Sequence, residues 1–559
     1  MKFSEMPYSR PDMEALAAAT TQTLEAMKAA PNAAGQIAAY DAYEKKMQTA
    51  GTMQQIAYIR HTINTKDEFY NAENDYMDEI GPKLQELTHR VNTALLESPY
   101  RAELERHYGA LMFKNLEIAA RSFSPAIVEL MQEENKLVSE YQNLYASATV
   151  EFDGKTMPLP LLGPYKQDPD RAVRKAAYEA DAKFFDSHRE ELDTLYDKLV
   201  KVRDAQAKKM GLPNYIPLGY DRMGRNCYTA KDVAAFRDQI AEDMVPIVAK
   251  VKEAQRRRIG VEKLAFYDEP ISFADGNAVP EGTPDEILAA GKKMYQELSP
   301  ETAEFIGFMF ENELFDVLSR DGKAPGGYCT EIADYKSPFI FSNFNATAGD
   351  VDVLTHEAGH AFEAYRAFKQ ELPSLLHSPT IEACECHSMS MEFLTAPWHH
   401  LFFGKQTDKY ELGHCEDALV FIPYGCMVDE FQHKVYENPG MTPEQRNELW
   451  LSLEKKYRPW IDFDNLPFYS RGGGWHIYEV PLYYIDYCMA QTVAFQFWNL
   501  SRENYAEAWK RYMTFVDKAG TATFAELVES AGLKVPYHAG CIKEIGESIS
   551  RWLEEHELG

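Results

Sequence analysis

The stretch LTHEAGHAFEAY, residues 354–365, places two histidines and a glutamate close together between apolar flanks. On an α-helix, residues four apart lie about one turn above each other, so His356 and His360 point to the same side. The apolar flanks predict a largely buried helix. Because buried imidazoles and carboxylates need partners, the fold must supply them. We favour a bound metal ion over a solvated helix face.

The spacing of the two histidines suits zinc, which binds imidazole nitrogen at about 2.0–2.1 Å. Glu357 lies about 100° around the helix, beside the metal position and not on it. A carboxylate there can take a proton from water held at the metal, which is the chemistry of the His-Glu-x-x-His motif. A catalytic zinc needs a third protein ligand and leaves one place open.

The segment SPTIEACECHSMSMEFL, residues 378–394, supplies candidates for that third ligand. They are Glu382, Cys384, Glu385, Cys386, His387 and Glu392. Glu385 and Glu392 share a helix face because they are two turns apart. The two cysteines diverge on a helix, so we read them as small buried thiols. Spacing alone does not choose among the glutamates.

Composition excludes several classes of partner. The formal charge of −29 over 559 residues argues against nucleic acid or an anionic membrane surface. No apolar run reaches the roughly 20 residues of a membrane helix, and the start, MKFSEMPYSRPDMEAL, has no apolar signal core. The eight cysteines include no Cys-x-x-Cys pair, which argues against a disulfide framework. We therefore expect a cytoplasmic protein.

Helix-forming residues dominate the chain. Ala, Glu, Lys, Leu and Met prevail over most of the first two hundred residues, and a helical pattern prevails again from Thr355 onward. The predicted class is mainly α. We expect an N-terminal helical region over residues 1–200 and a helical catalytic domain over residues 201–559.

Two segments interrupt the helical pattern with strand-like residues. ATVEFDGKTMPLPLLGPY alternates around Asp153-Gly154, which predicts a β-hairpin near residues 150–157. Residues 324–350 mix glycines with β-branched and aromatic residues and predict short strands directly before the histidine helix. We therefore expect two small β insertions. Within the histidine helix, Gly359 costs about 1 kcal/mol relative to Ala, which a close-packed neighbour would explain.

The motifs together resemble the thimet oligopeptidase and oligoendopeptidase F family of zinc metallopeptidases. HEAGHAFEAY followed by ECHSMSMEF carries the resemblance. GGYCTEIADYKSPFIFSNFNAT, VDEFQHKVYENPGMTPEQRNELW and WHIYEVPLYYIDY extend it over most of the chain. The chain is most similar to the branch with the Pz-peptidases, which cut proline-containing, collagen-like peptides.

The resemblance implies an architecture and an activity. The fold would have two largely helical halves around a deep substrate channel, with small β insertions near the active site. The activity would be cleavage of internal peptide bonds in short oligopeptides, with one Zn²⁺ per chain. The resemblance leaves open whether the chain is a monomer or a homo-oligomer.

The resemblance also implies roles for individual residues. His356, His360 and Glu385 would be the zinc ligands and Glu357 the general base. Glu385 is chosen because the family's ligand is followed by a serine three residues later and a glutamate seven later, as it is here. The later glutamate, Glu392, either orients a ligating histidine or is an ordinary packing carboxylate.

The resemblance also implies hydrogen-bond donors for the oxyanion, the negatively charged oxygen that forms from the substrate carbonyl during hydrolysis. They lie in the glycine-rich segment SRGGGWHIYEVP and the helix after it. His476 and Tyr478 match the family's donors, and the glycines at 472–474 would let them swing inward on binding. A second family tyrosine falls near Ile485, so this chain departs from the pattern there. The candidates that replace it are Tyr484 and Tyr487, whereas we expect Tyr483 to pack in the core.

Substrate contacts are expected just before the histidine helix. Gly326, Gly327 and Tyr328 would present backbone groups to an extended peptide by strand addition, or they form a tight turn that supports the helix. Two other functions remain open. One is a related helical His-Glu-x-x-His carboxypeptidase, and the other is a catalytically inactive peptide-binding scaffold.

Overall fold

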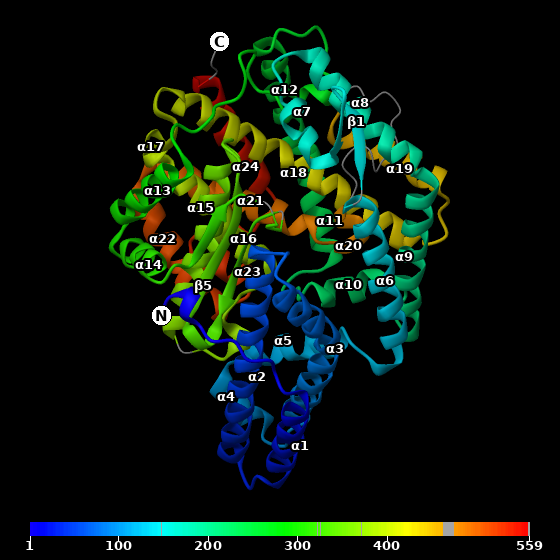
Figure 1. Cartoon of the computed structure of the whole chain (residues 1–559), viewed down its shortest axis with the longest axis vertical. Coiled ribbons are helices and arrows are strands. Elements are labelled where there is room, and N and C mark those ends of the chain that lie inside the picture. The colour runs from blue at the N-terminus through cyan, green and yellow to red at the C-terminus, as the bar shows by residue number, and fades with distance from the viewer. Residues whose placement is uncertain (147, 321, 325, 371, 462–474, 557–559) are drawn as a thin grey trace. The chain divides into compact units, whose positions relative to one another are not determined.

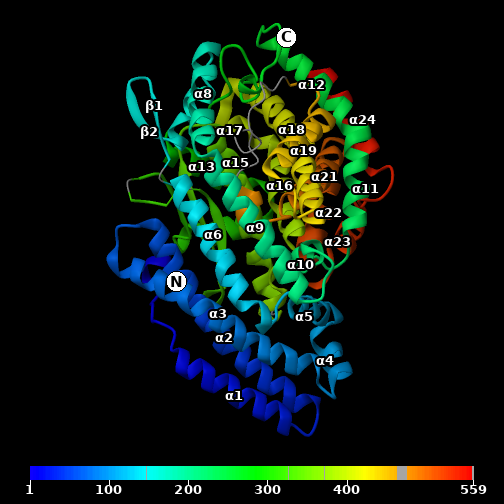
Figure 2. The ribbon, with the colours of Figure 1, turned by 90° about the vertical axis from the view of Figure 1, so that its right-hand side faces the viewer.

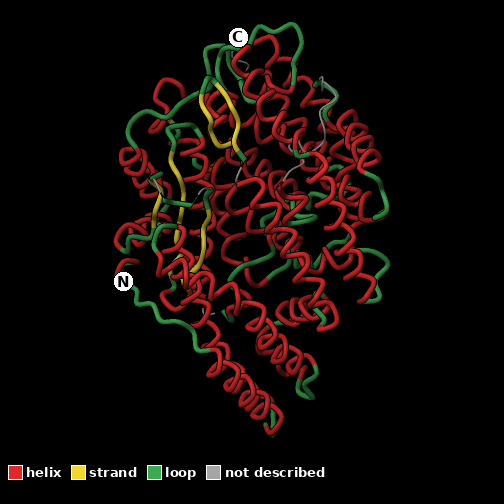
Figure 3. The backbone as a smooth tube through the Cα atoms, turned by 45° about the vertical axis from the view of Figure 1, so that its right-hand side comes forward, coloured by secondary structure: helices red, strands yellow, loops and turns green. Residues whose placement is uncertain are grey.

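Helices make up most of the computed structural model, which describes residues 1–146, 148–320, 322–324, 326–370, 372–461 and 475–556. The strands in these residues form two small sheets (Figure 3). The mainly α class is therefore confirmed. The chain divides into two compact units, each built from three segments. Unit 1 comprises residues 1–120, 279–407 and 493–533, and unit 2 comprises residues 121–278, 408–492 and 534–559.

Unit 1 begins with long helices that run side by side, as α1 to α3 show (Figure 2). Its helices are α1 (Met13–Ala29), α2 (Ala33–Ile63), α3 (Glu68–Leu96), α4 (Arg101–Tyr108), α5 (Ala110–Arg121), α13 (Pro284–Leu298), α14 (Pro300–Glu311), α15 (Gly349–Ala367), α16 (Ile381–Leu394), α17 (His400–Phe403), α22 (Tyr505–Lys518) and α23 (Phe524–Ser530). Asp12 and Asp67 begin α1 and α3 by accepting hydrogen bonds from two backbone N–H groups each, which satisfies donors that the helix itself leaves unpaired.

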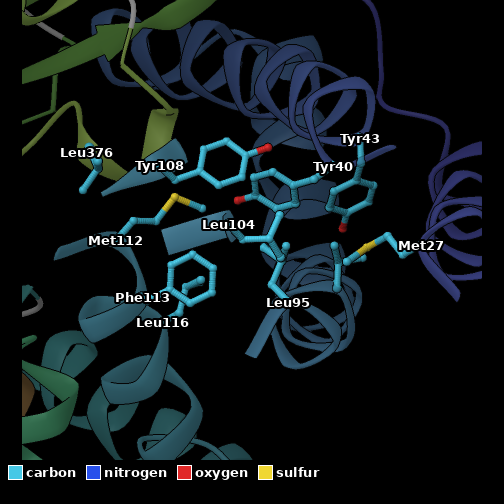
Figure 4. Packing of buried hydrophobic residues seen from close by; sticks show 11 residues of the cluster. Met27, Tyr40, Tyr43, Leu95, Leu104, Tyr108, Met112, Phe113, Leu116 and Leu376 are labelled. Carbon is cyan, nitrogen blue, oxygen red and sulfur yellow. The ribbon is translucent and has the colours of Figure 1, made fainter. Parts of the chain in front are cut away.

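The first helices of unit 1 enclose a core of their own (Figure 4). Its centre is aromatic, because the rings of Tyr40 and Tyr108 meet edge to face at 5.4 Å between centroids. The Tyr108 hydroxyl donates to Asp41 Oδ1 at 2.7 Å, so a phenol is buried without losing its hydrogen bond. The apolar side chains around them come from α1, α3, α4 and α5, and Leu376 joins them from the segment before α16.

The second part of unit 1 is a three-stranded sheet with helices packed against it. The strands are β3 (Phe315–Leu318), β4 (Tyr328–Ile332) and β5 (Ser337–Phe344), in the order β3-β5-β4. β5 pairs parallel with β3 and antiparallel with β4. Helix α15 packs against β4 and β5, and α16 packs against α15 (Figure 1). The short strands expected before the histidine helix are therefore present.

Unit 2 is also helical, apart from one hairpin. Its helices are α6 (Val128–Ala146), α7 (Gly163–Lys166), α8 (Arg171–Ser187), α9 (Arg189–Lys209), α10 (Tyr215–Arg222), α11 (Ala230–Gln239), α12 (Val245–Arg258), α18 (Thr407–Glu437), α19 (Pro443–Tyr457), α20 (Trp475–Glu479) and α24 (Cys541–His556). Helix α21 (Tyr484–Glu503) contains residues of both units.

The hairpin lies where the sequence predicts it. Strands β1 (Thr149–Phe152) and β2 (Lys155–Pro158) pair antiparallel. Asp153 and Gly154 between them have φ angles of 51° and 71°, as a two-residue hairpin turn with positive φ requires.

The expected boundary at residue 200 does not separate the compact units. Residue 200 lies inside α9, and both units return to the chain after it. Composition could not show this, because the segments of each unit are far apart in sequence and share the same helical character. In the described residues, no helix is both long and apolar enough to cross a membrane.

Candidate metal centre

Helix α15 carries the His-Glu-x-x-His motif in a buried setting. Asp350 fixes its first turn by accepting hydrogen bonds from the backbone N–H groups of Asn345 and Ala346, both at 2.8 Å. One turn apart on this helix, the rings of His356 and His360 lie 5.0 Å from each other. The helix therefore points both imidazoles to one side, as the spacing predicts.

A glycine lets α16 approach the histidines closely. A Cβ atom on Gly359 would lie 2.6 Å from Ser388 Cα and 2.7 Å from the His387 carbonyl oxygen. Real Cβ atoms do not come so close to backbone, so only glycine permits this spacing between α15 and α16. The close-packed neighbour expected from a glycine inside a helix is the backbone that carries Glu385.

We expect Gly359→Ala to destabilise unit 1 by about 1–3 kcal/mol, the usual cost of overpacking, and to weaken metal binding because α16 must move. The intrinsic helix preference of alanine, about 1 kcal/mol, opposes this effect but does not remove the backbone clash. Urea unfolding and a zinc titration measure the two effects. Gly307→Ala in α14 is the matched control, since its Cβ would meet nothing within 4 Å. Equal stability of the two variants would contradict the close approach.

The ligand atoms of His356, His360 and Glu385 form one group. Glu385 Oε2 lies 3.3 Å from His356 Nε2 and 3.5 Å from His360 Nε2, and all three atoms lie within 4.8 Å of one another. Ligands about 2.0–2.1 Å from a tetrahedral zinc are about 3.3–3.4 Å apart. Among the described residues, these are the three His, Cys, Asp or Glu side chains whose ligand atoms lie this close together. The residues therefore fit a zinc ion.

The charges of the group suit a cation. Burial alone would raise the pKa of Glu385, but hydrogen bonds from His356 and His360 outweigh it and hold that pKa well below its usual value. Burial disfavours a charged His356, yet its hydrogen bonds to Glu385 and Glu392 raise its pKa well above the usual value. Positive charge is thus stabilised at this point, and a divalent ion would take the place of the protons on the histidine nitrogens that face Glu385.

Glu392 orients one of the histidines. Its Oε1 lies 2.8 Å from His356 Nδ1, and because a carboxylate only accepts, Nδ1–H is the donor. When a metal ion displaces the proton on Nε2, the lone pair of His356 lies on that atom, which faces Glu385. This arrangement is typical of histidines that bind metals, and it favours the orienting role over the packing role.

Glu392→Ala should therefore weaken zinc binding by about 10–100-fold, the usual effect of losing such a partner. The reason is that His356 loses the contact that fixes its tautomer and ring orientation. Competition with a zinc chelator gives the affinity. Glu86→Ala on the exposed face of α3 is the control and should leave the affinity unchanged. An unaltered affinity in Glu392→Ala would assign Glu392 to packing alone.

Ser388, the serine three residues after Glu385 in the family pattern, contacts the Glu385 carboxylate directly. Its hydroxyl lies 3.1 Å from Glu385 Oε2 and 3.0 Å from the Glu385 backbone oxygen. It can therefore donate to the carboxylate that completes the group. The spacing accounts for this contact, because a serine three residues after a glutamate on a helix lies on the same face.

The other candidate ligands on α16 lie outside the group. Glu382 is fully buried, and its Oε1 accepts a hydrogen bond from the Thr380 hydroxyl at 2.8 Å. Burial lowers the pKa of His387 to about 3, with a smaller effect from His360, and its ring packs edge-on against Phe515. Cys384 and Cys386 are free thiols. The geometry thus separates Glu385 from the alternatives that spacing left open.

Glu357 lies beside the group, next to the start of β4. A Cβ atom on Gly327 would lie 3.7 Å from Glu357 Oε1 and 3.4 Å from Val353 Cγ1. Burial raises the pKa of Glu357, while nearby His356 and His360 oppose the shift. A carboxylate with a raised pKa is a better proton acceptor near neutral pH. A side chain at position 327 would therefore touch Glu357, and glycine avoids that contact.

The expected oxyanion donors lie in unit 2, and their placements differ. The Tyr478 side chain is fully buried, stacks on Tyr141 at 4.3 Å and donates its hydroxyl to the Leu192 carbonyl at 3.0 Å. This is the placement of a core residue and does not support Tyr478 as a donor to substrate. A pattern of tyrosines in sequence cannot distinguish a packed phenol from an available one.

For the remaining candidates, the role of oxyanion donor stays a prediction. Tyr484 and Tyr487 are partly exposed, and burial raises the pKa of Tyr484 to about 12, which keeps its hydroxyl protonated. Tyr483, expected in the core, is also partly exposed, and its hydroxyl donates to that of Tyr487. His476 belongs to α20, but its side chain lies outside the described residues, as do the glycines at 472–474.

Comparison with known families decides the class of the chain. A profile described as Peptidase M3 N-terminal domain matches residues 3–123. A second profile, described as Peptidase family M3, matches residues 164–274 and 296–547, more than half of the chain. The chain belongs to peptidase family M3. The M3 domains match the resemblance seen in the sequence, and they make the chain a metallo-endopeptidase.

One solved structure and two sequence relatives are similar to this M3 peptidase. The solved structure of Pz peptidase A with an inhibitor is 49% identical, covers 100% of both chains and has a TM-score of 0.93. An oligoendopeptidase F homologue of Borreliella burgdorferi is 22% identical over 70% of this chain and 69% of its own. An oligoendopeptidase F homologue of Mycoplasma pneumoniae is 24% identical over 54% of this chain and 49% of its own. This M3 peptidase thus matches Pz peptidase A from end to end and the two homologues over part of its length.

Proposed function

We propose that this M3 peptidase is a zinc-dependent endopeptidase that hydrolyses internal peptide bonds of short oligopeptides. One Zn²⁺ per chain is held by His356, His360 and Glu385, and Glu357 is the general base. The observation that carries the proposal is the group of three ligand atoms at zinc-like separations with a buried carboxylate one residue from the first histidine. The similarity to Pz peptidase A and the oligoendopeptidase F homologues supports oligopeptides as the substrate class.

Each residue of the site has a separate role in the proposed hydrolysis. When bound, zinc supplies a Lewis acid that lowers the pKa of water and polarises a carbonyl. Glu357 accepts a proton from the attacking water and returns it to the leaving amine, for which its raised pKa is suited. Glu392 holds His356 in the tautomer that a ligand needs. Hydroxyl or imidazole donors stabilise the oxyanion. The resemblance implies His476 for this role, and Tyr484 or Tyr487 replaces the family tyrosine that this chain lacks.

Peptides blocked at both ends test the proposal. N-acetylated, C-amidated peptides of about ten residues are incubated with zinc-loaded protein, and mass spectrometry identifies the products. We expect cleavage at internal bonds, because the chemistry needs no free terminus. Removal of single residues from unblocked peptides only would favour the carboxypeptidase, and no products from any peptide would favour the inactive scaffold.

A further inference from the structure

Strand β4 has an open edge that begins at the general base. It pairs with β5 on one side, and in the described residues it has no strand on the other. Its first residue, Tyr328, follows Gly327, where a Cβ atom would lie 3.7 Å from Glu357 Oε1. An unpaired edge offers backbone N–H and C=O groups to an extended chain. A peptide that pairs with β4 would therefore pass Glu357.

A hollow of about 340 Å³ is lined on one side by the first three residues of β4. Its walls come from α2, α3 and β4, all in unit 1. The helices contribute Gln54, Gln55, Tyr58, Asn74 and Met77, and the strand contributes Tyr328, Cys329 and Thr330. Tyr58 is 41% exposed, so an aromatic ring lines the hollow without being covered by the protein.

The β4 side chains that line the hollow are held in place by contacts to β5 and α2. The Tyr328 ring stacks on Phe341 at 4.7 Å, and its hydroxyl lies 2.7 Å from Thr62 Oγ1. The Thr330 hydroxyl donates to Gln55 Oε1 at 2.8 Å. Tyr328 and Thr330 are two apart on the strand and so share one face of the sheet, the face toward α2. The hollow is thus pre-formed and not a gap between mobile side chains.

The lining is uncharged. The described lining residues include amides, hydroxyls, a thiol, a thioether and two phenol rings, but no Asp, Glu, Lys, Arg or His. Moving a charged side chain from water into such a site costs free energy unless a partner charge is present. A neutral side chain with hydrogen-bonding atoms or an aromatic or other flat ring would instead find amides to bond and phenol rings to pack on.

We propose that this hollow is a specificity pocket for the substrate, which binds an uncharged polar or ring-containing side chain near the cleaved bond. The inference rests on the proposed function, because it places the cleaved bond at Glu357. An extended chain advances about 3.3 Å per residue, and the lining residues of β4 are one to three residues beyond Gly327. The bound side chain therefore belongs to a residue about two positions from the cleaved bond.

A charge added to the pocket tests the proposal. Gln54→Glu puts a carboxylate in the lining, and Gln54→Lys puts an ammonium there. Each variant is compared with the native protein on a library of end-blocked peptides in which every position carries Lys, Glu, Gln or Tyr in turn. We expect Gln54→Glu to raise the kcat/KM ratio of Lys to Glu by about 5–30-fold at one position, and Gln54→Lys to shift it in the opposite direction at the same position. Gln22→Glu, exposed on α1, makes the same charge change elsewhere and should alter no position.

The outcomes separate the two proposals. A native protein that cleaves the library while both Gln54 variants keep its preference at every position would overturn the pocket and leave the proposed function intact. Equal shifts in Gln54→Glu and Gln22→Glu would also overturn it, because they would report the net charge and not the hollow. A zinc-loaded native protein that cleaves no peptide would overturn the proposed function and the pocket together.

Discussion

Glu357→Gln will keep its zinc and its fold and will lose about 10²–10⁴-fold in kcat on a good peptide. Glutamine has the same shape as glutamate but accepts no proton at neutral pH, so the attacking water loses its base. Because Glu357 is not one of the three grouped ligands, metal content should stay at that of the native protein. Steady-state kinetics, elemental analysis and circular dichroism measure the three quantities on the same sample.

Glu363→Gln is the matched control for this variant. Glu363 lies on the same helix, is 4% exposed, and burial raises its pKa well above the usual value. Since burial disfavours the charged carboxylate there, a neutral amide of the same shape should be tolerated, and kcat should change little. Native-like turnover in Glu357→Gln, or an equal loss in both variants, would remove Glu357 from the role of general base.

Glu385→Ala is expected to lose zinc. The variant removes one of three ligands and leaves two histidines that no longer share a carboxylate. The loss of affinity should exceed the roughly 10–100-fold that follows from losing an orienting partner, and hydrolysis should fall with metal content. Titration of metal-free protein with zinc, followed by calorimetry, gives the affinity and the number of sites.

Glu382→Ala distinguishes this result from a general disturbance of α16. Glu382 is on the same helix and fully buried, but its carboxylate contacts Thr380 and lies outside the ligand group. Its variant should lose some stability and still bind one zinc. Full zinc occupancy in Glu385→Ala together with loss in Glu382→Ala would show that the third ligand has been assigned to the wrong glutamate.

The local features of the site could be predicted from sequence because they depend on helix and turn geometry. The four-residue spacing of His356 and His360 places both side chains on the same side of the helix. The dipeptide Asp153-Gly154 predicts a hairpin because it favours the positive φ angles of a two-residue turn. The choice of Glu385 needed more than spacing. It followed from the resemblance, and the geometry agrees with it, because Glu385 Oε2 lies 3.3 and 3.5 Å from the Nε2 atoms of the two histidines.

Long-range arrangement could not be predicted. The two compact units take alternate segments of the chain, and helical composition is the same in both. The hydrogen bond between Thr330 and Gln55, two residues that line the hollow, joins positions 275 residues apart in sequence. No local sequence pattern encodes such a contact. Tyr478 is the opposite case, because its motif indicated a donor while tertiary packing placed it in the core of unit 2.

The most direct test of the metal centre is X-ray diffraction from zinc-loaded crystals, with anomalous data measured on both sides of the zinc absorption edge. We predict one anomalous peak per chain, in contact with His356 Nε2, His360 Nε2 and a Glu385 carboxylate oxygen. A peak held by other side chains, or none at these three in crystals soaked with excess zinc, would contradict the account.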